Sequence, residues 1–264
     1  IQELARAVSP GARHNSRHWN GAFSSAQRRR AISLLTRFGS YESLIPLIEA
    51  LSDTHYDVCK DAETALSAIC ERFDPADRRT RIVYHALVDA LRVLPLAARK
   101  VAARLLVSGP ADLVLKPVLA YGLRAEEWWA RREAVWVLGT MGDIRATRRL
   151  MDCLLDPSDV VRATAAWALG RLDAPVAIKA LVRASEEQDE RVRGAALEAL
   201  GAYATRPSSD EGHLRLIIDR LIAALADPDA GVRIAALEIL SGLSIPQARI
   251  ALQRLLRERS GTAL

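Results

Sequence analysis

The chain has 264 residues, of which 50% are apolar and only 5% aromatic, and its formal net charge is +5. No uncharged stretch is long enough to cross a bilayer as a helix, which argues against a membrane protein. Cys59, Cys70 and Cys153 form no CxxC pair and no even set, so we expect reduced thiols in a cytoplasmic protein.

The positive charge is concentrated in the first half of the chain. Residues 1–138 hold 20 Lys and Arg against 15 Asp and Glu, whereas residues 139–264 hold 17 of each. We expect residues 1–24 to form a basic N-terminal segment that is at most partly ordered. The asymmetry of charge favours an acidic partner.

One short phrase recurs through the rest of the chain, and its clearest copies are VRATAAWALG (161–170) and VRGAALEALG (192–201). The equivalent reference positions are Arg28, Cys59, Arg99, Arg131, Arg162, Arg193 and Arg233, spaced 31, 40, 32, 31, 31 and 40 residues apart. A repeat of this length predicts a solenoid, in which each unit buries its apolar face only by stacking on its neighbours.

Each repeat predicts two helices. Around Arg162, the residues Val161, Ala165, Ala168 and Leu169 follow the period of an amphipathic helix. A second apolar helix is expected before each phrase, in chain order over residues 44–51, 82–91, 113–123, 145–155, 176–184 and 214–226. The glycines that follow the phrase, Gly139, Gly170 and Gly201, are expected to end these helices in a left-handed cap.

These phrases resemble HEAT repeats, specifically the short bacterial type described as phycobilisome-lyase HEAT-like. The shared pattern is an acidic residue in the turn and an arginine six residues later, as in Asp156/Arg162, Glu187/Arg193 and Asp227/Arg233. The resemblance covers residues from about 25 to 256 and implies an all-α, right-handed α-solenoid of about seven helix pairs over residues 25–264. It also implies a ladder of acidic and arginine side chains, with each carboxylate in the same repeat or in the adjacent one. Cys59 predicts an interruption of that ladder.

The positions one and five residues after each reference residue point away from the predicted core, since each residue turns the helix by about 100°. The resemblance implies that this face is concave. Along the chain it changes from basic to tryptophan-rich to acidic, and the expected partner-binding residues are Arg29, Lys60, Lys100, Arg104, Trp129, Arg132, Trp136, Trp167, Glu198 and Glu238. Trp136 and Trp167 should be adjacent. Exposed tryptophans beside arginines are typical of binding sites, and the alternative is that the rings lie flat and cover neighbouring helices.

Catalytic and metal-binding patterns are absent from the sequence. It contains no GxSxG, HExxH, P-loop or dinucleotide-binding motif. His14 and His18 have the spacing of a helical metal site, but no acidic or cysteine ligand is near them. We therefore expect no enzyme activity, no metal and no cofactor.

Three binding functions fit the expected surface. The leading hypothesis is a protein-binding scaffold or adaptor that grips an acidic or apolar segment of another protein. The second is nucleic-acid binding, because alkylpurine DNA glycosylases are similar HEAT-like proteins with a basic face and aromatic side chains. The third, implied by the family resemblance, is a chaperone-type subunit of a bilin lyase.

Overall fold

The computed structural model describes Leu4, Ala7 and residues 23–72, 74, 76–77, 79–206 and 210–243. Every regular element in these residues is a helix, which confirms the all-α class. The contacts divide the chain into two compact units, Ile1–Val137 and Leu138–Leu264, and the boundary falls inside one helix. Most of the predicted N-terminal segment, with His14 and His18, lies outside the described residues.

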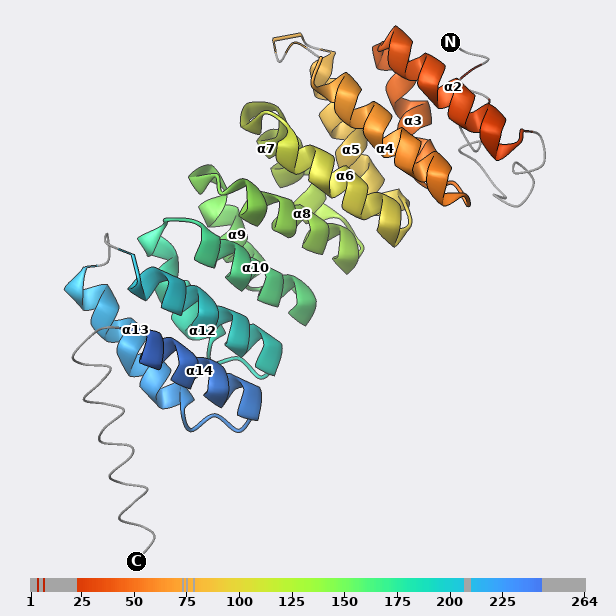
Figure 1. Ribbon diagram of the computed structural model, residues 1–264. Coiled ribbons are helices and arrows are strands. Elements are labelled where there is room, and N and C mark those ends of the chain that lie inside the picture. The colour runs from red at the N-terminus through yellow and green to blue at the C-terminus, as the bar shows by residue number, and fades with distance from the viewer. Residues whose placement is uncertain are drawn as a thin grey trace, which may run out of the picture. The chain divides into compact units, whose positions relative to one another are not determined.

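The first unit is built from two layers of helices (Figure 1). Its helices are α2 (Ser25–Phe38), α3 (Leu44–Ala50), α4 (Tyr56–Cys70), α5 (Thr80–Val93), α6 (Leu96–Ser108), α7 (Ala111–Ala120) and most of α8 (Trp128–Met141). Helices α2, α4 and α6 pack in sequence in one layer, and α3, α5 and α7 pack in sequence in the other. The pairs α3–α4 and α5–α6 are therefore the helix pairs that the repeat predicts.

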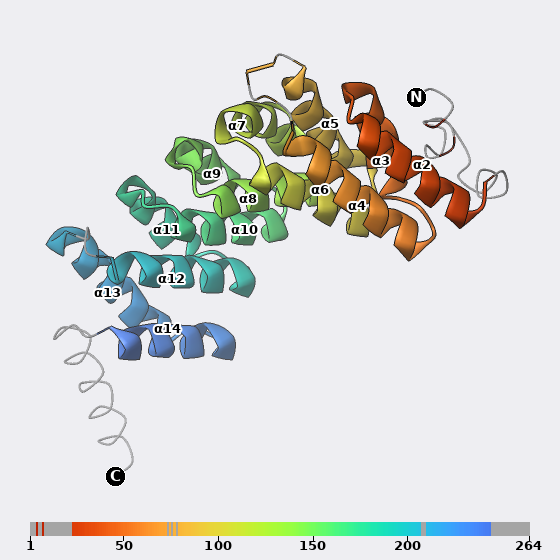
Figure 2. The same ribbon diagram turned by 45° about the horizontal axis from the view of Figure 1, so that its top comes forward.

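The second unit repeats this arrangement (Figure 2). It contains α9 (Thr147–Cys153), α10 (Asp159–Arg171), α11 (Ile178–Ala184), α12 (Glu190–Ala204), α13 (Glu211–Ala224) and α14 (Ala230–Gly242). Helices α10, α12 and α14 pack in sequence, and α11 packs on α13. Short 3₁₀ turns occur in both units: Tyr41–Ser43 and Gly122–Arg124 in the first, and Ile144–Ala146 and Pro175–Ala177 in the second. The predicted α-solenoid of stacked helix pairs is thus confirmed within each unit.

Small apolar side chains and acidic caps produce these elements. Ala165, Ala168 and Leu169 of α10 are fully buried, as their periodicity predicts. The carboxylates of Asp189 and Asp229 accept backbone N–H groups at the start of α12 and α14, which satisfies donors that a helix leaves open. Each of these repeats therefore begins its long helix with a side-chain cap and buries the alanine-rich face of that helix.

The prediction that Gly139, Gly170 and Gly201 form left-handed caps is wrong. All three lie inside helices, and only Gly39 and Gly142 have a positive φ among the described glycines. A Cβ atom on Gly170 would lie 2.8 Å from the Cα of Ala199 in the next long helix. Glycine is required there because two helix backbones approach closely, so the repeated glycine provides space rather than a turn conformation.

We predict opposite effects for two alanine substitutions on long helices. Gly170→Ala should lower the free energy of unfolding by about 1–2 kcal/mol, because overpacking outweighs the higher helix propensity of alanine. Gly194→Ala is the matched control, since a Cβ atom on Gly194 would meet nothing within 4 Å, and it should stabilise the protein by about 0.5–1 kcal/mol. Denaturant unfolding followed by circular dichroism measures both, and equal effects would contradict the packing role.

The arginines of the repeat form the expected ladder. Arg193 Nη1 donates to the carbonyls of Glu187 and Gln188, at 2.9 and 2.6 Å, in the turn before its own helix. Its Nε and Nη2 donate to Asp227 in the turn of the following repeat, at 2.9 and 2.7 Å. Arg162 likewise bonds to the Asp156 carbonyl at 2.8 Å and to the Glu187 carboxylate at 2.8 Å. The carboxylate partner is therefore in the adjacent repeat.

In the first unit the ladder is intact at Arg28 but interrupted at Cys59 and at Arg99. Arg28 is nearly buried and makes a bidentate pair with Asp53, at 2.7 and 2.9 Å. Cys59 keeps only the contact with its own turn, because its Sγ donates to the Asp53 carbonyl at 3.1 Å. At Arg99 the acidic position of the next turn is Ala125, and within the described part of the chain the buried Nε of Arg99 has no hydrogen-bond partner. The sequence predicted the interruption at Cys59, and it also indicated a departure around Arg99, whose repeat lacks a clean acidic turn.

Replacing one charged side chain of a buried ladder pair should lower the free energy of unfolding more than replacing both. Arg193→Met leaves the buried Asp227 carboxylate unpaired and should cost about 3–5 kcal/mol of unfolding free energy, whereas Arg193→Met with Asp227→Leu should recover most of it. Chemical denaturation of the three proteins tests this. A double variant that is as unstable as the single variant would contradict it.

The same pair predicts a loss of stability in acid. Burial alone would raise the pKa of Asp227, but its bonds with Arg193 and the Asp229 N–H outweigh burial, and the pKa lies below its ordinary value. A lowered folded-state pKa adds stability above the ordinary Asp pKa of about 3.9, and this contribution disappears as the pH falls through the folded-state pKa. The wild type should therefore lose more stability below about pH 4 than the double variant, as measured by denaturation at a series of pH values.

Candidate functional site

Four of the predicted binding residues meet in one depression of the first unit. It has a volume of about 230 Å³ and lies between α6 and α8, lined by Lys100, Ala103, Arg104, Arg132, Glu133 and Trp136. Lys100 and Arg104 are one helical turn apart on α6, and Arg132 and Trp136 are one turn apart on α8. The small side chain of Ala103 leaves room between the two helices beside the indole ring.

The exposure of these side chains suits contact with a partner. Lys100 and Arg104 are exposed, and Arg132 and Trp136 are partly exposed. Trp136 is therefore neither buried in the core nor free in solvent. A ring held in this way loses little conformational freedom when it is covered by a ligand.

Acidic residues that the sequence did not lead us to predict compensate part of the positive charge. Arg132 Nη1 donates to the buried Glu133 at 2.6 Å, and Arg104 Nη2 donates to Glu63 of α4 at 2.5 Å. Lys60 Nζ lies 3.6 Å from the same Glu63. Burial alone would raise the pKa of Glu63, but the bond from Arg104 and the nearby charges outweigh it and the pKa is lowered. Both glutamates lie two or four residues after a reference position, a spacing from which they could have been found.

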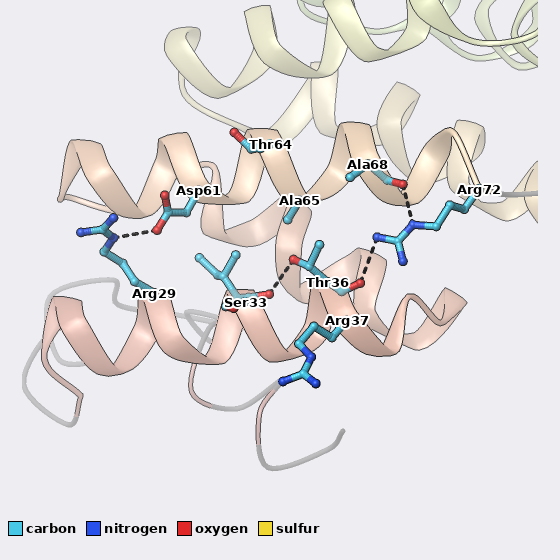
Figure 3. Close-up of a pocket in the computed structure, with 10 residues that line it drawn as sticks. Arg29, Ser33, Thr36, Arg37, Asp61, Thr64, Ala65, Ala68 and Arg72 are labelled. Atoms are coloured by element: carbon cyan, nitrogen blue, oxygen red, sulfur yellow. Dashed lines mark hydrogen bonds and ion pairs between the residues drawn. The ribbon is translucent and has the colours of Figure 1, made fainter.

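A second and larger depression lies between α2 and α4 (Figure 3). Its volume is about 680 Å³, and its walls carry Arg29, Ser33, Thr36, Arg37, Asp61, Thr64 and Arg72 over a floor of Ile32, Ala65 and Ala68. Arg29 was among the predicted residues. Arg37 and Arg72 were not, because Arg37 lies near the C-terminal end of α2 and Arg72 lies just after the end of α4, beyond the two positions used for the prediction.

The predicted tryptophans do not all share one environment. Trp129 is the second residue of α8. It is 36% exposed, packs edge to face with Trp128, and its ring centroid lies 5.5 Å from the Arg99 guanidinium. It does not line the α6–α8 depression. Trp167 of α10 is partly buried, with its ring close to Gly139 and 5.3 Å from the Arg171 guanidinium. These contacts favour the alternative that the Trp167 ring covers a neighbouring helix.

Two further predicted residues are acidic side chains of the second unit. Glu198 of α12 and Glu238 of α14 are exposed, and neither makes an ion pair within the described residues. Trp136 belongs to the first unit and Trp167 to the second, so the expected adjacency of their rings stays a prediction.

The described residues offer little for metal binding, membrane insertion or thiol chemistry. The residues that the structure describes include no cluster of His, Cys, Asp and Glu suited to a metal ion. None of the described helices has the length and apolar character needed to cross a membrane. No disulfide joins Cys59, Cys70 and Cys153, and burial raises the pKa of Cys70 to about 11, which makes it a poor nucleophile.

Comparison with known proteins identifies the repeats and the fold. The sequence profile of HEAT repeats matches residues 84–168 and again residues 115–201. No curated protein matches the chain. Among solved structures, proteins with sequence identities of 21% or less share its fold.

The complex of CpcE and CpcF of phycocyanin lyase from Nostoc sp. PCC7120 has a TM-score of 0.53 at 21% identity, and the match covers 60% of this chain and 98% of that one. Kap95p, in a structure with RanGDP, has a TM-score of 0.60 at 15% identity, covering 89% of this chain and 37% of that one. Importin beta has a TM-score of 0.58 at 19% identity, covering 91% and 35%. The match therefore spans little more than a third of the length of Kap95p and of importin beta.

Proposed function

Because this chain is a HEAT-repeat protein, whose stacked helix pairs present long open faces, we propose that it is a non-enzymatic protein-binding scaffold. The partner docks on the depression between α6 and α8. The observation that carries this proposal is the convergence of Lys100, Arg104 and Arg132 around the partly exposed ring of Trp136.

The chemistry of this depression fits one side chain of a partner protein. Tryptophan and arginine are the residues most enriched in the energetic centres of protein interfaces. A volume of about 230 Å³ is below the roughly 300–1,000 Å³ of typical small-molecule pockets. An apolar side chain would lie against Trp136, and a neighbouring carboxylate would bind Lys100, which is exposed at the rim.

Nucleic acid is the weaker candidate for this surface. Single strands bind to grooves in which several aromatic rings stack successive bases, and Trp136 is the only aromatic residue that lines this depression. Glu63 and Glu133 would also repel a phosphate backbone. We accordingly favour a protein partner, and place the protein in the cytoplasm, where its free thiols remain reduced.

Two tryptophan variants of α8 test the proposal. Trp136→Ala should weaken partner binding by at least tenfold, because central tryptophans of interfaces contribute about 2 kcal/mol or more. Trp128→Ala is the matched control, since Trp128 is 43% exposed on the same helix but does not line the depression. Affinity capture from cell extract, quantified by mass spectrometry, should reveal a protein retained by the wild type and by Trp128→Ala but lost with Trp136→Ala.

The wild type and the two tryptophan variants also test the nucleic-acid alternative. The wild type should show no Trp136-dependent binding to random single-stranded oligonucleotides at low salt. Equal capture by both tryptophan variants, or oligonucleotide binding that depends on Trp136 and falls steeply with salt, would contradict the proposed protein-binding role.

A further inference from the structure

The groove between α2 and α4 is a separate depression from the one between α6 and α8. Arg29 lies near one end of the groove, and Arg37 and Arg72 lie near the other. Hydroxyl groups of Ser33, Thr36 and Thr64 line the wall between them. The groove therefore has arginine side chains at both ends and hydroxyl groups between them.

The three arginines retain free donors. Arg29 Nε donates to Asp61 at 2.6 Å, and the two side chains are 48% and 35% exposed, so this pair contributes little to stability. Arg72 spans the groove through Nε, which donates to the Ala68 carbonyl, and Nη2, which donates to the Thr36 carbonyl (Figure 3). Arg37 makes no hydrogen bond or ion pair with the described residues. The lining thus carries three positive charges and the single negative charge of Asp61.

The spacing of the arginines defines the ligand. Arg29 and Arg37 are eight residues apart on α2, which corresponds to about 12 Å along a helix that rises 1.5 Å per residue. An extended peptide advances about 3.3 Å per residue, so about four residues span this distance. Because side chains alternate in an extended chain, residues four apart point to the same side. We propose that the α2–α4 groove binds an extended peptide with two acidic residues four positions apart.

The shape and lining of the groove favour this ligand over the other candidates. A ligand helix, about 10–12 Å wide, is broader than the space between two helices packed about 8–10 Å apart. The lining has no aromatic side chain on which a nucleic-acid base could stack. The N-terminal segment of this chain is itself basic, so its charge does not complement the groove.

This inference does not depend on Trp136 or on the proposed α6–α8 docking site. The probe is a fluorescein-labelled Gly-Ser peptide with two glutamates four residues apart. The control peptide has the same composition with the glutamates adjacent. Fluorescence anisotropy at low salt should show that the spaced peptide binds about fivefold or more tightly than the control, and that added salt weakens it.

Two variants with the same change of charge locate the bound peptide. Arg37→Gln should reduce the affinity of the spaced peptide to that of the control peptide. Arg30→Gln should leave the difference between the peptides intact, because Arg30 is exposed on the same helix but does not line the groove. Circular dichroism melting of both variants checks that they remain folded.

Equal binding of the two peptides, or an equal effect of Arg30→Gln and Arg37→Gln, would overturn the inference. So would loss of peptide binding with Trp136→Ala, or Arg37-dependent binding of oligothymidylate that is tighter than binding of the spaced peptide. Loss with Trp136→Ala would place the peptide at the α6–α8 depression and leave the proposed function standing. Conversely, a Trp136→Ala variant that keeps peptide binding but also keeps its protein partner would overturn the proposed function and leave this groove as a separate site.

Discussion

The guanidinium group of Arg193 connects two consecutive repeats at a point where neither could satisfy its own polar groups. It donates to two carbonyls in the turn before α12 and to the carboxylate of Asp227 in the turn before α14. Both side chains are largely removed from water, so each depends on the other. Arg28 and Arg162 make equivalent contacts. This bridge holds the turns of consecutive repeats together, in addition to the packing of their helices.

Close approach of the long helices is the second constraint. Gly139 and Gly170 face Ala168 and Ala199 at distances that leave no room for a Cβ atom. The repeat must therefore keep its arginine, its acidic turn residue and its small residues. The positions one and five residues after the arginine carry none of these duties, and they hold the side chains of the α6–α8 depression.

The interrupted part of the ladder coincides with the candidate site. Arg99 lies on α6 directly before Lys100. The turn before α8 has Ala125 at the position where the turns before α4, α10, α12 and α14 have an acidic residue. Instead of a carboxylate, the Arg99 guanidinium meets the ring of Trp129. The structural requirement is relaxed between the two helices that supply the depression, so a partner bound there would displace no carboxylate pair of the ladder.

The sequence alone determined the class of fold and the helix pairs, because apolar periodicity and the repeat express local geometry that every unit shares, and the resemblance to HEAT repeats implied the arginine ladder. It also predicted Lys100, Arg104, Arg132 and Trp136, since a helix has a known angular step. Only the tertiary structure showed that Gly170 serves close packing, that Glu63 and Glu133 pair with the basic residues, and that Arg37 and Arg72 complete a groove. These features depend on distances between helices that are far apart in sequence, and no period within one helix encodes them.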